Sequence, residues 1–142
     1  MGVVSASFRV RTTVIEPREV GALLLHNADY MSRATTKRRK TLSPSGMHEW
    51  VIDIRADDTL DLAWLLEDLL EEVGPLAPKM AAVRAADPGV DVLFHLEVTP
   101  YSYRMSAAFK PEIVAGIAAL GGRFQVEFRD SAHVEDEEPN WM

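Results

Sequence analysis

The side chains best suited to chemistry occupy alternate positions of segments whose other positions are apolar. In residues 5–14, Arg9 and Arg11 alternate with Phe8 and Val10. In a β-strand this alternation sends the two sets to opposite faces of the sheet. Three further segments, at 49–55, 90–99 and 123–129, repeat the pattern. Together the four segments predict one polar surface composed of Arg9, Arg11, Asp53, Arg55, His95, Glu97, Gln125, Glu127 and Arg129.

Two interpretations of this polar surface are open. Arginines can hold a carboxylate or a phosphate, and His95 beside Glu97 or Glu127 can move a proton. The surface is then a binding site. Alternatively, the charges form cross-strand ion pairs on a solvated face. No spacing among these residues is specific to one reaction, which favours the second interpretation.

A basic segment supplies a second candidate binding site. Residues 33–46 are rich in Ser and Thr, lack a hydrophobic period and are expected to form a loop within the domain. The loop's basic run is suited to phosphate or to an acidic partner, or to the chain's own acidic segments. Aromatic residues are not interleaved with it, which argues against base stacking. The run consists of Lys37, Arg38, Arg39 and Lys40.

Several classes of active site lack their signatures. The sequence has no cysteine, and its four histidines show no recognised metal-ligand spacing. Hydrolase-elbow, P-loop and dinucleotide-binding motifs are also missing. The sequence therefore predicts no metal and no cofactor, and no catalytic residue stands out.

The elements that must position these residues are four strands and several helices. The strands are the segments with alternation, and in the last of them Phe124, Val126 and Phe128 are predicted to face the core. Helices are expected from Pro17, over 59–73, over 79–86 and from about Lys110. Trp50 and Trp64 are also predicted to be core residues.

The polar face of every strand predicts the fold class. Parallel sheets that are covered on both faces read as continuous apolar runs, and these strands do not. We expect an α+β two-layer sandwich with about four mostly antiparallel strands and helices on one face, of ferredoxin-like type. Residues 5–55 and 90–129 each read as strand, helix, strand, which predicts a duplicated β-α-β plan.

Length, composition and charge limit the remaining classes. The 142 residues suit one α+β domain over 1–130, followed by an acidic and flexible tail over 131–142. The net charge of −7 argues against a nucleic-acid partner. Neither a membrane span nor a signal peptide is visible, so a cytoplasmic protein is expected.

Four segments resemble one known family. They are ASFRV in the first strand, RRKTLSPSGMHEW around the basic run, LAWLLEDLL in the acidic helix and KPEIVAGIAALGGRFQVEF near the end. Over about residues 5–130 the chain resembles the bacterial domain-of-unknown-function 4279 family. The resemblance supports the fold and implies no substrate.

The charge distribution favours a non-enzymatic protein-binding or self-associating domain. Basic residues gather at 33–40 and acidic residues at 57–72 and 135–138, and complementary patches favour specific encounter. An immunity or regulatory role is an expectation by analogy. The alternative is a small enzyme or ligand-binding protein that takes an anionic metabolite on the polar face. His95 would then be its general base, with Arg9, Arg11 or Arg55 holding the anion.

Overall fold

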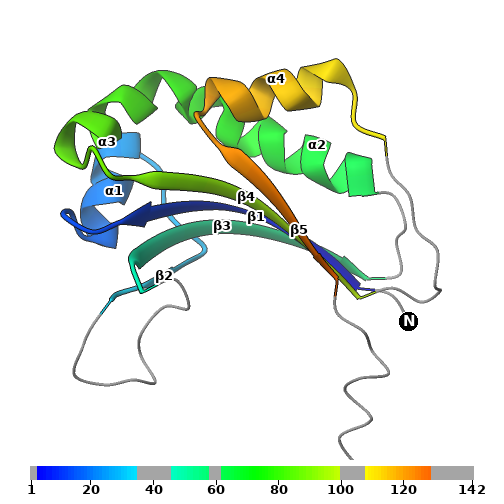
Figure 1. The fold of residues 1–142 in the computed structure, drawn as a ribbon, viewed down its shortest axis with the longest axis horizontal. Coiled ribbons are helices and arrows are strands. Elements are labelled where there is room, and N and C mark those ends of the chain that lie inside the picture. Colours follow the sequence, from blue (N-terminus) through cyan, green and yellow to red (C-terminus); the bar gives the residue numbers. More distant parts are fainter. Residues whose placement is uncertain (1–2, 35–45, 58–61, 100–107, 129–142) are drawn as a thin grey trace, which may run out of the picture.

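The computed structural model describes residues 3–34, 46–57, 62–99 and 108–128, which form an α+β fold with helices on one face of an open sheet (Figure 1). In chain order the elements are β1 (Val3–Thr12), α1 (Pro17–Leu24), β2 (Tyr30–Ser32), β3 (His48–Asp57), α2 (Leu62–Val73), the 3-10 helix η2 (Gly74–Lys79), α3 (Met80–Ala86), β4 (Asp91–Thr99), α4 (Pro111–Ala119) and β5 (Arg123–Phe128).

The sheet is mixed, with the strand order β2-β3-β1-β4-β5. The central strand β1 pairs antiparallel with both β3 and β4, and β2 pairs antiparallel with β3. Among the strands of the described residues, only β4 and β5 pair in parallel, and α4 lies between them in the chain. The α+β class and the one-sided helix layer are confirmed.

The predicted number of strands and the predicted duplicated plan differ from the structure in two respects. Five strands replace the four predicted, because β2 has only three residues and is too short to show an alternation. The ferredoxin-like, duplicated plan is not confirmed. In the first half β1 and β3 are antiparallel neighbours, whereas in the second half β4 and β5 are parallel neighbours.

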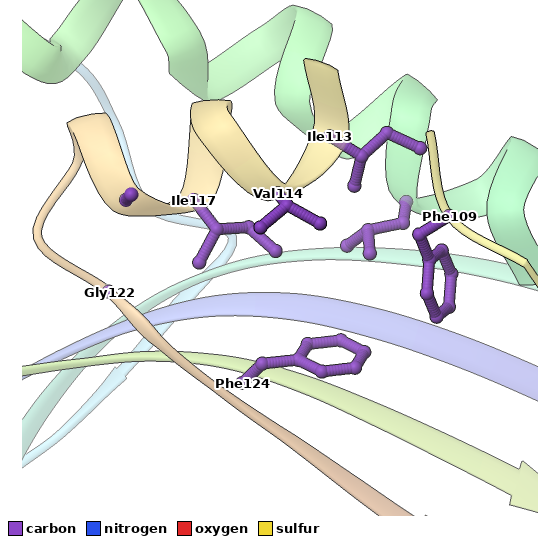
Figure 2. Close-up of a pocket in the computed structure, with 8 residues that line it drawn as sticks. Phe109, Ile113, Val114, Ile117, Gly122 and Phe124 are labelled. Atoms are coloured by element: carbon purple, nitrogen blue, oxygen red, sulfur yellow. The ribbon is translucent and has the colours of Figure 1, made fainter. Parts of the chain in front are cut away.

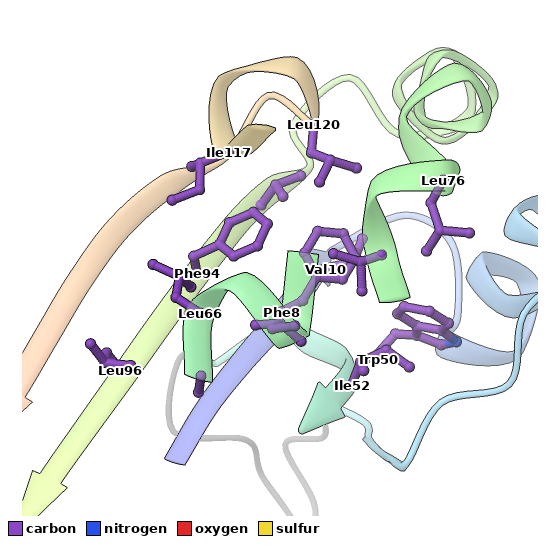
Figure 3. Packing of buried hydrophobic residues seen from close by; sticks show 14 of the residues in the cluster. Phe8, Val10, Trp50, Ile52, Leu66, Leu76, Phe94, Leu96, Ile117 and Leu120 are labelled. Carbon is purple, nitrogen blue, oxygen red and sulfur yellow. The ribbon is translucent and has the colours of Figure 1, made fainter. Parts of the chain in front are cut away.

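The core lies between the sheet and the helices (Figure 3). Phe8 on β1 is its centre, with its ring centroid 6.3 Å from that of Trp50 and 5.2 Å from that of Phe94. All three rings are almost fully buried. From the helix layer α2 contributes a stripe with helical spacing, Leu62, Leu65, Leu66, Leu69 and Val73. The prediction that Trp50 is a core residue is confirmed.

Two core predictions are wrong. Trp64 is 51% exposed, because it lies on α2 outside the leucine stripe. Phe124, Val126 and Phe128 on β5 are also exposed. The reason is the position of β5: it is an edge strand that begins beneath α4 and then runs away from the helix layer (Figure 1).

A buried aspartate joins the segment between β1 and α1 to the segment between α3 and β4. Asp87, just after α3, accepts hydrogen bonds through Oδ2 from the backbone N–H groups of Thr13 (2.9 Å), Val14 (2.8 Å) and Ile15 (3.4 Å). Burial works to raise the pKa of Asp87, but the hydrogen bonds from Val14, Thr13 and Ile15 together hold it below its ordinary value.

We predict that Asp87→Ala lowers the free energy of unfolding by about 2 kcal/mol at neutral pH, because three backbone N–H groups lose their buried acceptor. The folded-state pKa of Asp87 is lowered, so its contribution is complete above the unfolded value of about 3.9 and is lost as the pH falls through the folded value. Urea titrations of both proteins at pH values from neutral to acidic measure this. A difference in stability that does not shrink in acid would contradict the prediction.

Candidate functional site

The open face of the sheet carries the predicted polar surface. The register places Arg9 of β1 beside Val51 of β3 and Leu93 of β4, and Arg11 beside Glu49 and Asp91. Further along the strands, Ser7 lies between Asp53 and His95, and Ser5 lies between Arg55 and Glu97. Glu127 of β5 pairs with Glu97. Strand alternation therefore brings the predicted residues of the four long strands onto one surface.

The predicted site residues beyond these strands cannot be placed on that surface. Arg129 and the basic run lie outside the residues that the structure describes. The basic run comprises Lys37, Arg38, Arg39 and Lys40. Their role as a binding site therefore stays a prediction.

The most buried charge on this face is a carboxylate that the sequence analysis did not single out. The side chain of Glu49 is 2% exposed and lies between two arginines. Its Oε1 accepts from Nη1 of Arg9 at 3.1 Å, and its Oε2 accepts from Nε of Arg11 at 2.9 Å. Arg9 also donates to the hydroxyl groups of Ser7 and Tyr30. Both arginines are thus engaged inside the molecule.

The β4–β5 side of the face contains a second set of ion pairs. Arg123 donates from Nε and Nη2 to the two carboxylate oxygens of Asp91, both at 2.9 Å. These hydrogen bonds lower the pKa of Asp91, against the effect of burial. Nε2 of His95 lies 2.9 Å from Oε1 of Glu127. The sequence contained the signal for Asp91 and Arg123, since both share the parity of the polar positions on their strands.

Asp53 and Tyr30 are the acidic groups of this face whose pKa values are raised. Burial raises the pKa of Asp53, while Arg9 opposes the shift and Asp29 adds to it. Oδ2 of Asp29 accepts a hydrogen bond from the backbone N–H of Asp53 at 2.7 Å. Burial also raises the pKa of Tyr30. Perturbed groups can mark a functional site, but structural ion-pair networks perturb pKa values as well.

The polar face therefore has the chemistry of an internally neutralised surface. Charges of both signs interleave, and three arginines donate to carboxylates of the same face. An anionic ligand would have to compete with these carboxylates for the same donors. Within the described part of the chain, no cluster of three or more His, Asp or Glu residues is arranged to hold a metal ion.

An apolar surface lies at the β5 edge, on the helix side of the sheet. We call it the α4–β5 edge and define it by the exposed apolar side chains of α4 and β5: Val114, Ala115, Ala118, Ala119, Phe124, Val126 and Phe128. Phe128 is 60% exposed and Val114 is 58% exposed. From Ile113 to Ala119 the helix has no charged or polar side chain. A surface helix usually has a polar solvent face, so this helix lacks the normal signature of exposure.

A pocket of about 280 Å³ opens within this edge (Figure 2). Ile113, Val114 and Ile117 of α4 line one side, and Gly122 and Phe124 line the other. The ring of Phe109 closes one end, with its centroid 5.5 Å from that of Phe124. A Cβ at Gly122 would approach the Phe94 ring to 2.8 Å, so glycine lets β5 begin directly against the core. The walls are apolar, as in pockets that accept hydrophobic side chains.

The Glu49 arrangement gives a stability prediction. Glu49→Ala should lower the free energy of unfolding by about 3 kcal/mol, because Arg9 and Arg11 are left without their buried partner. The matched control is Arg33→Ala. It removes an exposed pair in which Arg33 lies 2.8 Å from Glu16, and it should cost at most about 1 kcal/mol. Equal losses in the two variants, measured by urea denaturation, would show that burial of Glu49 adds nothing.

Comparisons with known proteins agree with the predicted resemblance. Within the described residues, no helix combines the length and apolar composition needed to cross a membrane. No curated protein and no solved structure matches the chain. A family model described as "Domain of unknown function (DUF4279)" matches residues 3–131. The match covers nearly the whole sequence, and the chain belongs to the DUF4279 family.

Proposed function

We propose that the chain is a non-enzymatic protein-binding domain and that the α4–β5 edge is its binding surface. The observation that carries the proposal is the exposed apolar side chains of β5 beside a helix whose outer face is also apolar. Phe124, Val126 and Phe128 are all at least 38% exposed. Contiguous exposed apolar surface of this kind marks interaction sites in soluble proteins.

The composition and shape of the edge support this proposal. Aromatic side chains are enriched in protein interfaces and charged residues are depleted from interface centres. The edge has two phenylalanines, and no charged residue lies between Glu112 and Arg123. The two charges of β5, Arg123 and Glu127, alternate with its apolar positions and so belong to the opposite face of the sheet. A pocket lined by apolar side chains gives a partner's side chain a place to insert.

The sequence suggested the polar face as the binding surface, but we propose that this face stabilises the sheet. Arg9, Arg11 and Arg123 are engaged by carboxylates of the same chain, as expected if the ion pairs fix the sheet. We therefore assign the polar surface a supporting role and assign binding to the edge. The immunity-like or regulatory role, the bacterial source and the cytoplasmic location remain predictions.

The second candidate function is a small enzyme or ligand-binding protein that uses the polar face. The observation that favours it is the pair formed by His95 and Glu127, since a histidine oriented by a carboxylate is suited to proton transfer. The side chain of His95 is 12% exposed. A His95→Ala variant that keeps any activity found for the protein would remove this candidate.

The protein-binding proposal is tested by capture from cells in which the protein is native. We compare the tagged chain with Val114→Lys, on the α4–β5 edge, and with Val14→Lys, an identical change at a site that is 67% exposed and remote from the edge in sequence. Proteins retained by the parent should remain with Val14→Lys and fall at least tenfold with Val114→Lys, in both low and high salt, because the contact is apolar.

Either of two results would contradict the proposal. One is a set of captured proteins that is the same for all three baits. The other is a capture that retains nothing, neither another protein nor an untagged copy of the chain. Circular dichroism of the two variants ensures that loss of binding does not reflect loss of the fold.

A further inference from the structure

We propose that the partner at the α4–β5 edge is a second copy of this chain, paired antiparallel along β5 about a two-fold axis at Gln125. This inference rests on the proposed binding function and names the partner. The pairing would join two five-stranded sheets into one continuous sheet and would place Phe128 of each copy in the pocket of the other.

The first step is the difference between the two sheet edges. The β2 edge has three residues, which is one of the ways in which proteins protect an edge from pairing. The β5 edge has six residues, all of them exposed. An edge strand presents a row of backbone donors and acceptors, so β5 is the edge that is suited to adding another strand.

The second step is the charge pattern along β5, which is complementary to itself. Arg123 and Glu127 lie two residues before and two residues after Gln125. In an antiparallel pair centred on Gln125, Arg123 faces the partner's Glu127, and Glu127 faces the partner's Arg123. Opposite charges that face each other across strands are stabilising. Arg123 uses Nε and Nη2 for Asp91, which leaves Nη1 to reach a second carboxylate.

The neighbouring registers lack this complementarity. A two-fold axis perpendicular to the sheet keeps the helix layers of both copies on one side, and it passes through a residue that faces itself. With the axis at Val126, Gln125 faces the partner's Glu127. With the axis at Phe124, Arg123 faces the partner's Gln125. Only the axis at Gln125 pairs the two charges, so charge selects the register.

The third step is the apolar side of the same register. Here Phe124 faces the partner's Val126, an aromatic and β-branched pair of the kind that stabilises sheets. Gly122 faces the partner's Phe128. Directly opposed residues place their Cβ positions about 5 Å apart. Gly122 lines the pocket beneath α4, so the partner's Phe128 would enter that pocket. Both exposed phenylalanines of β5 are covered by this one arrangement.

The two-fold symmetry of this pairing limits the assembly to two chains. An isologous two-fold contact uses the same surface on both copies and closes after two chains, whereas head-to-tail pairing of edges continues into filaments. The apolar outer side chains of α4 lie next to the same edge, where each copy would shield them in part. We therefore infer a closed dimer.

The geometry is tested by single cysteines in a chain that has no cysteine of its own. Gln125→Cys places two sulfurs at the axis, where facing Cα atoms are about 5 Å apart, within the range of disulfides. The variant should form a covalent dimer on mild oxidation or with a short bismaleimide. Val126→Cys tests the axis one residue away, and Ser32→Cys tests the β2 edge; both should cross-link far less.

Sedimentation velocity of the unmodified full chain and of two variants provides the second measurement. The chain should be a dimer, and Phe128→Ala should weaken its dimerisation roughly tenfold to hundredfold, because a phenyl ring leaves its pocket. Val14→Ala, an exposed apolar residue away from the edge, should leave the dimer unchanged.

Three results would overturn the dimer. These are a monomer at every concentration up to millimolar, a dimer that is unaffected by Phe128→Ala, and stronger cross-linking at 126 or 32 than at 125. A monomeric chain that still captures another protein through Val114 overturns the self-pairing alone. A monomeric chain that captures nothing overturns the proposed function as well.

Discussion

The alternation of side chains along β1 is the constraint on which the rest of the structure depends. Phe8 and Val10 face the helices, while Arg9 and Arg11 face the other side. A slip of one residue would send the arginines into the core and the aromatic ring into solvent. Since β1 pairs with both β3 and β4, its register also fixes theirs. Glu49 strengthens this choice, because a slip of one residue would separate its carboxylate from the two arginines by placing them on opposite faces.

The same alternation produces two surfaces that differ in how far their side chains find partners within the chain. On the polar face, Arg9, Arg11 and Arg123 each donate to a carboxylate of a neighbouring strand. Along β5 the polar positions also find partners, in Asp91 and His95. The apolar side chains of β5, by contrast, are not covered by a helix beyond the first residues of the strand. Ion pairs within the chain thus occupy much of the described polar face, whereas the apolar side chains of β5 stay exposed. The exposed apolar side chains are where another chain gains most by binding.

Much of the fold could be predicted from local pattern, but strand order could not. Alternation identified the residues that share the polar face, among them Asp53, His95 and Glu127. It could not show that Glu49 lies between two arginines, since that depends on which strands are neighbours. It also placed Phe124 and Phe128 in the core, because an apolar position on an edge strand has the same sequence signature as one in the sheet centre. The three-residue β2 is too short to carry a period.

The error at β5 is informative about function. The alternation along β5 is typical of a strand with one buried face, yet that face is exposed in the single chain. This combination is expected of a surface that becomes buried in an assembly. We therefore propose that a second β5 covers β5.

Amide hydrogen exchange followed across a range of protein concentrations tests this claim most directly. If β5 pairs with a second β5, residues 122–128 exchange more slowly as the concentration rises, while the β2 edge at Tyr30–Ser32 does not change. Exchange at 122–128 that is independent of concentration, or protection that appears at β2 instead, would contradict it.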